Sequence, residues 1–179
     1  AVPPPVPRVF VALPSGDGWI KTEALVGLLL ATQHAHIHYE PAARSLLPTN
    51  FNHLLCAARN TRDQCPWTHW AMHHNDLSAP ELWLDTMLAE MDRVGADILS
   101  AVVAIKDDRR ITSTGAVEPN RSIRRLTLKE VHRLPETFSA DDLPAIGIHG
   151  PLVVNTGLLL VRFDQPWSDE FHFAQGDDI

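Results

Sequence analysis

The sequence has few cysteines and no long apolar run. Cys56 and Cys65 are the only cysteines among 179 residues, and they lack CxxC spacing, which favours two reduced thiols over a disulfide framework. The longest apolar stretch, residues 24–31, is interrupted by Gly27 and falls well short of the ~20 residues that a membrane span requires. The first residues have neither the basic region nor the apolar stretch of a secretory signal. We therefore expect a cytoplasmic protein with no membrane span.

Positive charge is also scarce. Fifteen Lys and Arg residues against 22 Asp and Glu residues give a formal net charge of −7. Nucleic acid is therefore excluded as an expected partner, because binding its backbone requires clustered Lys and Arg. The composition, 45% hydrophobic and 21% charged, is that of an ordinary globular protein. We expect residues 1–8 to form an extended proline-rich tail and residues 9–179 to form a single domain.

Strand-like and helix-like patterns alternate along the chain. Because apolar strands separated by helices are typical of a sheet covered on both faces, the pattern predicts an α/β fold. The expected architecture is a mostly parallel, Rossmann-like sheet with helices on both faces. The predicted strands are residues 9–13, 35–39, 67–72, 97–105 and a broken run at 152–163, and the predicted helices are residues 20–33, 50–60 and 81–94.

The boundaries of the third helix are predicted most sharply. Ser78-Ala79-Pro80-Glu81 has the form of a capping box, in which Ser78 caps the helix and Glu81 reaches back. Gly95 follows the last inward-facing residue and is typical of a helix end.

Polar residues follow several of the predicted strands, at the edge where open α/β sheets bind ligands. They include residues 15–17, Glu40, residues 73–76 and residues 106–108. Strand ends are polar in any protein because loops are exposed. Position alone therefore does not distinguish a functional site from ordinary exposed loops.

One combination of motifs resembles a known family. Ala58-Arg59-Asn60 is followed by residues 67–76, which read WTHWAMHHND. Together they resemble the GT-A glycosyltransferases of the large inverting family that also contains cellulose-synthase-like and many bacteriophage enzymes. In that family a DxD-type motif follows a strand. Ala79-Pro80-Glu81-Leu82 and Asn155-Thr156-Gly157 continue the resemblance, which covers residues 9–163.

The resemblance implies a site for a nucleotide-sugar. Asp76 matches the last Asp of the DxD motif, which binds Mn²⁺ or Mg²⁺, and the ion stabilises the charge on the leaving diphosphate. His74 stands where the first Asp would be, and it would ligate the metal or contact the ribose or phosphate. The residues that the resemblance places against the nucleotide are Pro14, Ser15, Glu40, Arg59, His74 and Asn75.

The catalytic base of this family lies in a late acidic motif. Asp177 and Asp178 stand in that direction, Asp169 and Glu170 are alternatives, and His172 is a candidate late metal ligand. We expect the chain to lack further C-terminal elements of the family.

These features predict a metal-dependent glycosyltransferase that uses a nucleotide-sugar, with a UDP-sugar as the favoured donor and an unknown hydroxyl acceptor. Two alternatives stay open. The first is a binding or scaffold module of the same fold without turnover, because His74 replaces a carboxylate. The second is a zinc hydrolase, because the sequence has ten histidines, although it has no HxHxDH or HExxH pattern. His34, His36 and His38 are expected on one face of one strand, and His69 and His73 on one face of another.

Overall fold

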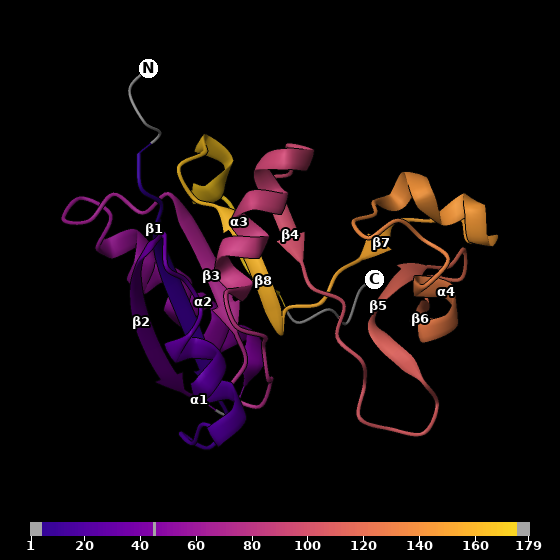
Figure 1. The fold of residues 1–179 in the computed structure, drawn as a ribbon, viewed down its shortest axis with the longest axis horizontal. Helices are drawn as coiled ribbons and strands as arrows, with labels where there is room; N and C mark the ends of the chain where they lie inside the picture. Colours follow the sequence, from indigo (N-terminus) through magenta and orange to yellow (C-terminus); the bar gives the residue numbers. More distant parts are fainter. Residues whose placement is uncertain (1–4, 45, 175–179) are drawn as a thin grey trace. The chain divides into compact units, whose positions relative to one another are not determined.

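The computed structural model describes residues 5–44 and 46–174. These residues form two compact units, which are described separately (Figure 1). The first unit contains the chain up to Leu99 and resumes at Thr156, and the second contains Ser100–Asn155. Across the described residues, each helix is too short or too polar to span a lipid bilayer.

The first unit is built on a five-stranded mixed sheet. Strand β1 pairs in parallel with β2 on one side and with β3 on the other, and β3 pairs antiparallel with β8. The strand order is β2-β1-β3-β8-β4. The strands are β1 (Arg8–Ser15), β2 (His36–Ala43), β3 (His69–His73), β4 (Ile98–Ser100) and β8 (Leu158–Arg162).

The prediction of a mostly parallel sheet is wrong. Strand β8 enters between β3 and β4 and runs antiparallel to β3. The residues of β8 are almost all buried, as is typical of parallel strands. Because an apolar run does not indicate strand direction, the sequence could not show that β8 is antiparallel. The predicted strand at residues 97–105 is also too long. After β4 the chain enters the second unit, where Ala104 forms a bridge with Thr112.

Helices cover both faces of this sheet. Alternate side chains of β1 and β3, among them Phe10 and Trp70, pack with α2 (Leu47–Asn60) in one core cluster. The other side chains of β3 face the opposite side, where the ring of His73 lies 5.5 Å from that of Trp83 in α3 (Trp83–Val94). Helix α1 (Thr22–Leu29) joins α3 through a hydrogen bond from Trp83 Nε1 to Gly27 O, 3.1 Å.

The third helix begins differently from the prediction. Helix α3 starts at Trp83, and its N-cap is Leu82 in a left-handed conformation (φ 57°), so the predicted capping box is wrong. Backbone N–H groups at the start of the helix find tertiary partners instead. Leu82 N donates to Leu30 O at 2.8 Å, and Leu84 N donates to Ala31 O at 3.0 Å. The predicted helix end at Gly95 is confirmed, since Gly95 is the left-handed C-cap.

The second unit holds a three-stranded antiparallel sheet in the order β6-β5-β7. Its core cluster contains Ala116, Leu126, Leu143 and Ile148. Sequence patterns in this region were too weak to predict the sheet. The elements are β5 (Ile111–Val117), β6 (Ile123–Thr127), α4 (Leu128–Val131), the 3₁₀ helix η1 (Ala140–Ile146) and β7 (Leu152–Val153), and the first unit adds the 3₁₀ helix η2 (Pro166–Asp169).

Gly150 generates a prediction about the stability of the second unit. Its φ is 153°, and a Cβ at this position would lie 2.1 Å from Val117 O. Replacing Gly150 with Ala should therefore lower the free energy of unfolding by about 3 kcal/mol. Gly16→Ala is the control, because its Cβ would meet nothing within 4 Å. Urea denaturation of both variants checks this, and equal midpoints would contradict the close approach.

Candidate functional site

The sheet of the first unit has a switch point between β1 and β3. From β1 the chain moves to β2 on one side, and it later returns to β3 on the other side of β1. Because all three strands are parallel, the loops after β1 and β3 leave the same edge of the sheet in opposite directions. Ligands of open α/β sheets bind outside the carboxyl ends of strands at such a point.

Asn75 joins these two loops. Its Nδ2 donates to Trp19 O at 2.6 Å and to Ser15 Oγ at 3.2 Å. In the reverse direction, the backbone N of Lys21 donates to Asn75 O at 3.0 Å. The structure thus brings together two residues that the sequence predicted for the nucleotide site, Ser15 and Asn75.

Ser15 also organises the loop that follows β1. Its hydroxyl accepts a hydrogen bond from Gly18 N at 2.8 Å and lies 2.9 Å from Asp17 Oδ1. Asp17 in turn accepts from Trp19 N at 3.0 Å. These bonds, first from the Trp19 backbone and then from the Ser15 hydroxyl, lower the pKa of the exposed Asp17 carboxyl. Sequence reasoning placed Asp17 in a polar cluster but gave it no role, because its position beside the β3 loop depends on the fold.

His74 and Asp76 follow β3, but their side chains differ in environment. Asp76 is exposed. The His74 ring lies 5.5 Å from that of Phe51, and its buried Nε2 has no hydrogen-bond partner within the described residues. Burial lowers the pKa of His74, and the charge of Asp76 opposes this effect. The net result favours a neutral imidazole at physiological pH.

Glu40 and Arg59 do not lie at the switch point. Strand β2 continues three residues past Glu40 to Ala43, and the Glu40 carboxylate pairs with His38 Nε2 at 3.0 Å. Arg59 donates to the carbonyl oxygens of Ser168 and Phe171 at 2.5 Å. Asn50, near the start of the same helix, contacts Ser15 O at 3.1 Å, so the rise of the helix places Arg59 about 13 Å farther along its axis.

The remaining nucleotide candidate, Pro14, is buried within β1 opposite Ala42.

The candidates near the C-terminus are only partly described. His172 is exposed, and its Nδ1 lies 3.2 Å from Glu170 O. The next residue, Phe173, is fixed by two hydrogen bonds with Asn52, at 2.7 and 2.8 Å, and its ring lies 5.1 Å from Phe51. The chain after His172 therefore packs on the same phenylalanine as His74. Asp177 and Asp178 lie outside the described residues.

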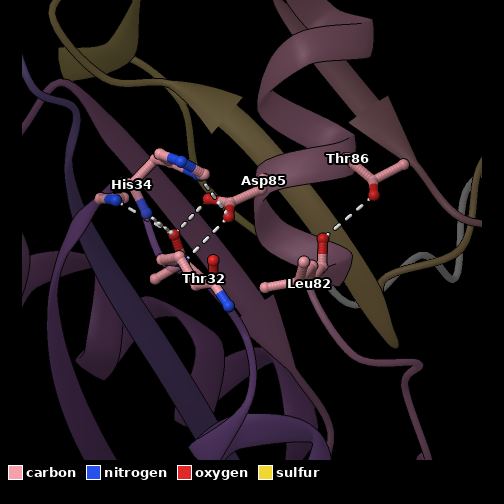
Figure 2. Close-up of polar contacts among 7 residues, drawn as sticks. Thr32, His34, Leu82, Asp85 and Thr86 are labelled. Atoms are coloured by element: carbon pink, nitrogen blue, oxygen red, sulfur yellow. Dashed lines mark hydrogen bonds and ion pairs between the residues drawn. The ribbon is translucent and has the colours of Figure 1, made fainter.

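A separate polar network lies at the opposite edge of the sheet, before β2 (Figure 2). Asp85 of α3 accepts hydrogen bonds from Gln33 N at 2.9 Å and from the Thr32 hydroxyl, and it lies 3.0 Å from His34 Nδ1. Burial opposes ionisation of Asp85, but these donors together hold its pKa below the usual value. The network connects α3 to the segment between α1 and β2. It includes His34, one of the histidines that suggested a zinc site. In the described part of the chain no three His, Cys, Asp or Glu side chains gather as a metal site.

Comparisons with known proteins give little guidance. No protein-family model matches the chain, and no curated protein matches it. Among solved structures, it is similar to A197 from STIV, with 12% sequence identity over 97% of this chain and 96% of that one. The TM-score of 0.38 is too low to support an inference about fold or function.

Two buried histidines, His69 and His73, and the partly buried His74 predict how stability depends on pH. Burial lowers the pKa of His69, His73 and His74 below the usual 6.5. Below about pH 6.5 the unfolded chain therefore binds more protons than the folded protein. The free energy of unfolding should therefore fall as the pH is lowered through 6.5, by up to about 1 kcal/mol per histidine between pH 6.5 and 5.5.

Urea denaturation at a series of pH values measures this slope. His73→Leu should reduce it, whatever its effect on stability at pH 7.5. His172→Gln, a change at an exposed position, should leave it unchanged. A parent protein with equal stability at pH 7.5 and 5.5 would contradict this account of the three imidazoles.

Proposed function

We propose that the protein transfers a sugar from a nucleotide-sugar to a hydroxyl acceptor, with the donor diphosphate at the switch point between β1 and β3. The observation that carries the proposal is the convergence of two polar loops, residues 15–21 and 74–76, at the carboxyl ends of parallel strands. The motif resemblance independently assigns the second of these loops to the donor phosphates. A UDP-sugar is the favoured donor.

The acidic loops fit a divalent cation more readily than they fit an unaccompanied diphosphate. Asp17 and Asp76 are both exposed carboxylates on the joined loops, and carboxylate oxygen is a preferred ligand of Mg²⁺ and Mn²⁺. Mg²⁺ commonly takes one or two carboxylates and completes its shell with phosphate oxygens and water, so two carboxylates suffice. When bound, the ion would offset the negative charge that develops on the leaving diphosphate.

The residues of the chain then have separate tasks. Asn75 holds the two loops in register, and Ser15 and Asp17 fix the turn that would border the diphosphate. In the transfer, the acceptor oxygen forms a bond to C1 of the sugar, and the bond from C1 to the diphosphate breaks with its electron pair on the phosphate oxygen. The acceptor proton passes to a base. Asp177 or Asp178 is proposed for this role.

One observation favours the alternative of nucleotide binding without turnover. His74 occupies the position of the first DxD carboxylate, and its Nε2 is buried behind Phe51. A site with fewer carboxylates would bind its metal more weakly. Detection of product release from labelled donors separates the two functions.

Asp76→Asn tests the metal assignment. The substitution removes a charged oxygen ligand, so Mn²⁺-dependent affinity for the nucleotide should fall roughly tenfold or more. The donor is first identified by thermal-shift measurements with UDP-, GDP-, CMP- and dTDP-sugars, with and without Mn²⁺. Calorimetry with that nucleotide then compares the variant with the parent protein.

Asp92→Asn is the matched control. Asp92 is an exposed aspartate of α3 that pairs with Arg162 at 2.7 Å, and its substitution should leave nucleotide affinity within about twofold. Equal Mn²⁺-dependent affinity in Asp76→Asn and the parent protein would refute the role of Asp76.

A further inference from the structure

An apolar pocket of about 310 Å³ opens beside the switch point. Strands β1 and β2 supply Leu13, Tyr39 and Pro41, and helix α1 supplies Leu25 and Leu29. The volume lies at the lower end of the ~300–1,000 Å³ range of small-molecule pockets.

The pocket wall continues onto the proposed donor site. Ser15 and Asn75, which join the two loops, also line the pocket. Trp19 lines it as well and is 77% exposed. Leu29 of α1, another lining residue, is 73% exposed. Large apolar side chains in water at the border of a cavity are the arrangement expected where an apolar ligand covers them.

The polar side chains that line the pocket already form hydrogen bonds within the protein. Both hydrogens of the Asn75 amide are donated, to Trp19 O and Ser15 Oγ. The Tyr39 hydroxyl donates to Leu28 O, and the Ser15 hydroxyl is held by Gly18 N and Asp17. A nucleobase or a sugar placed here would exchange hydrogen bonds with water for contacts with leucine side chains, which is unfavourable.

We propose that this pocket binds the apolar part of the acceptor, so that the acceptor is a hydrophobic alcohol and not a sugar. At the packing density of protein interiors the volume accommodates about a dozen non-hydrogen atoms, which is the size of a bicyclic aromatic or branched aliphatic alcohol. The hydroxyl group would lie at the end of the pocket that Asn75 and Ser15 border, where it faces the proposed donor site. The role as acceptor rests on the proposed function, whereas binding of the alcohol does not.

Calorimetry with 2-naphthol as the probe tests the proposal in the full chain. We expect saturable binding with one site per chain. Leu25→Asp places a carboxylate in the pocket and should weaken this binding about tenfold or more. Val26→Asp is the matched control, because Val26 is adjacent on α1, similarly exposed (49% against 42%) and not part of the lining, so affinity should stay within about twofold.

Two competitors identify the class of ligand. Uridine and methyl α-glucoside should not displace 2-naphthol, and Leu25→Asp should retain Mn²⁺-dependent nucleotide binding. Absence of saturable 2-naphthol binding, equal binding by Leu25→Asp and Val26→Asp, or displacement by uridine or the glucoside would each overturn the proposal. A wrong assignment of the donor site would give a different result from a wrong assignment of the pocket. The parent protein would then show no Mn²⁺-dependent nucleotide binding but would still bind 2-naphthol.

Discussion

The parallel pairing of β1 with strands on both sides is the constraint on which the first unit depends. Val9, Val11 and Ala12 of β1 have no solvent exposure, and their backbone groups are paired with β2 and β3. Two parallel neighbours require the chain to cross back over the sheet twice, which places α1 and α2 on opposite faces. The same crossovers bring the loops after β1 and β3 to one edge, where Asn75 joins them.

Much of this central part could be predicted from sequence, because its elements are local patterns of buried residues. The apolar runs of β1 and β3 and the periodicity of α2 and α3 give the elements, and Gly95 marks the end of α3. Strand direction could not be predicted, since β8 presents the same apolar pattern in either orientation. The start of α3 was misjudged because tertiary hydrogen bonds from Leu82 and Leu84 replace the local capping interaction that Ser78 and Glu81 suggested.

The structure brings together those candidate residues that follow strands, and it separates from them a candidate that was placed by a helix motif. Ser15 and Asn75 meet because each follows a strand of the same parallel set. Arg59 was assigned to the nucleotide from a motif, but it lies at the far end of α2 and binds the carbonyls of Ser168 and Phe171. Pocket residues such as Tyr39 and Leu29 come from different elements, so no spacing in the sequence relates them.

The described contacts divide the neighbourhood of the switch point by polarity. Asp17 and Asp76 are exposed carboxylates on the two loops that Asn75 joins by hydrogen bonds, and the cavity between α1 and β2 is lined mainly by apolar side chains. Such a division would suit the proposed reaction between a charged donor and an apolar acceptor, because desolvation would disfavour each of them in the other's compartment.

Paramagnetic relaxation by Mn²⁺ tests the central claim most directly, because it locates the ion without relying on activity. Amide resonances of the labelled protein are recorded with UDP while Mn²⁺ is added in small amounts. If the donor diphosphate and its ion bind at the switch point, the signals of residues 16–21 and 74–76 should broaden first. Broadening that begins elsewhere, for instance around Arg59 at the far end of α2, would contradict the account.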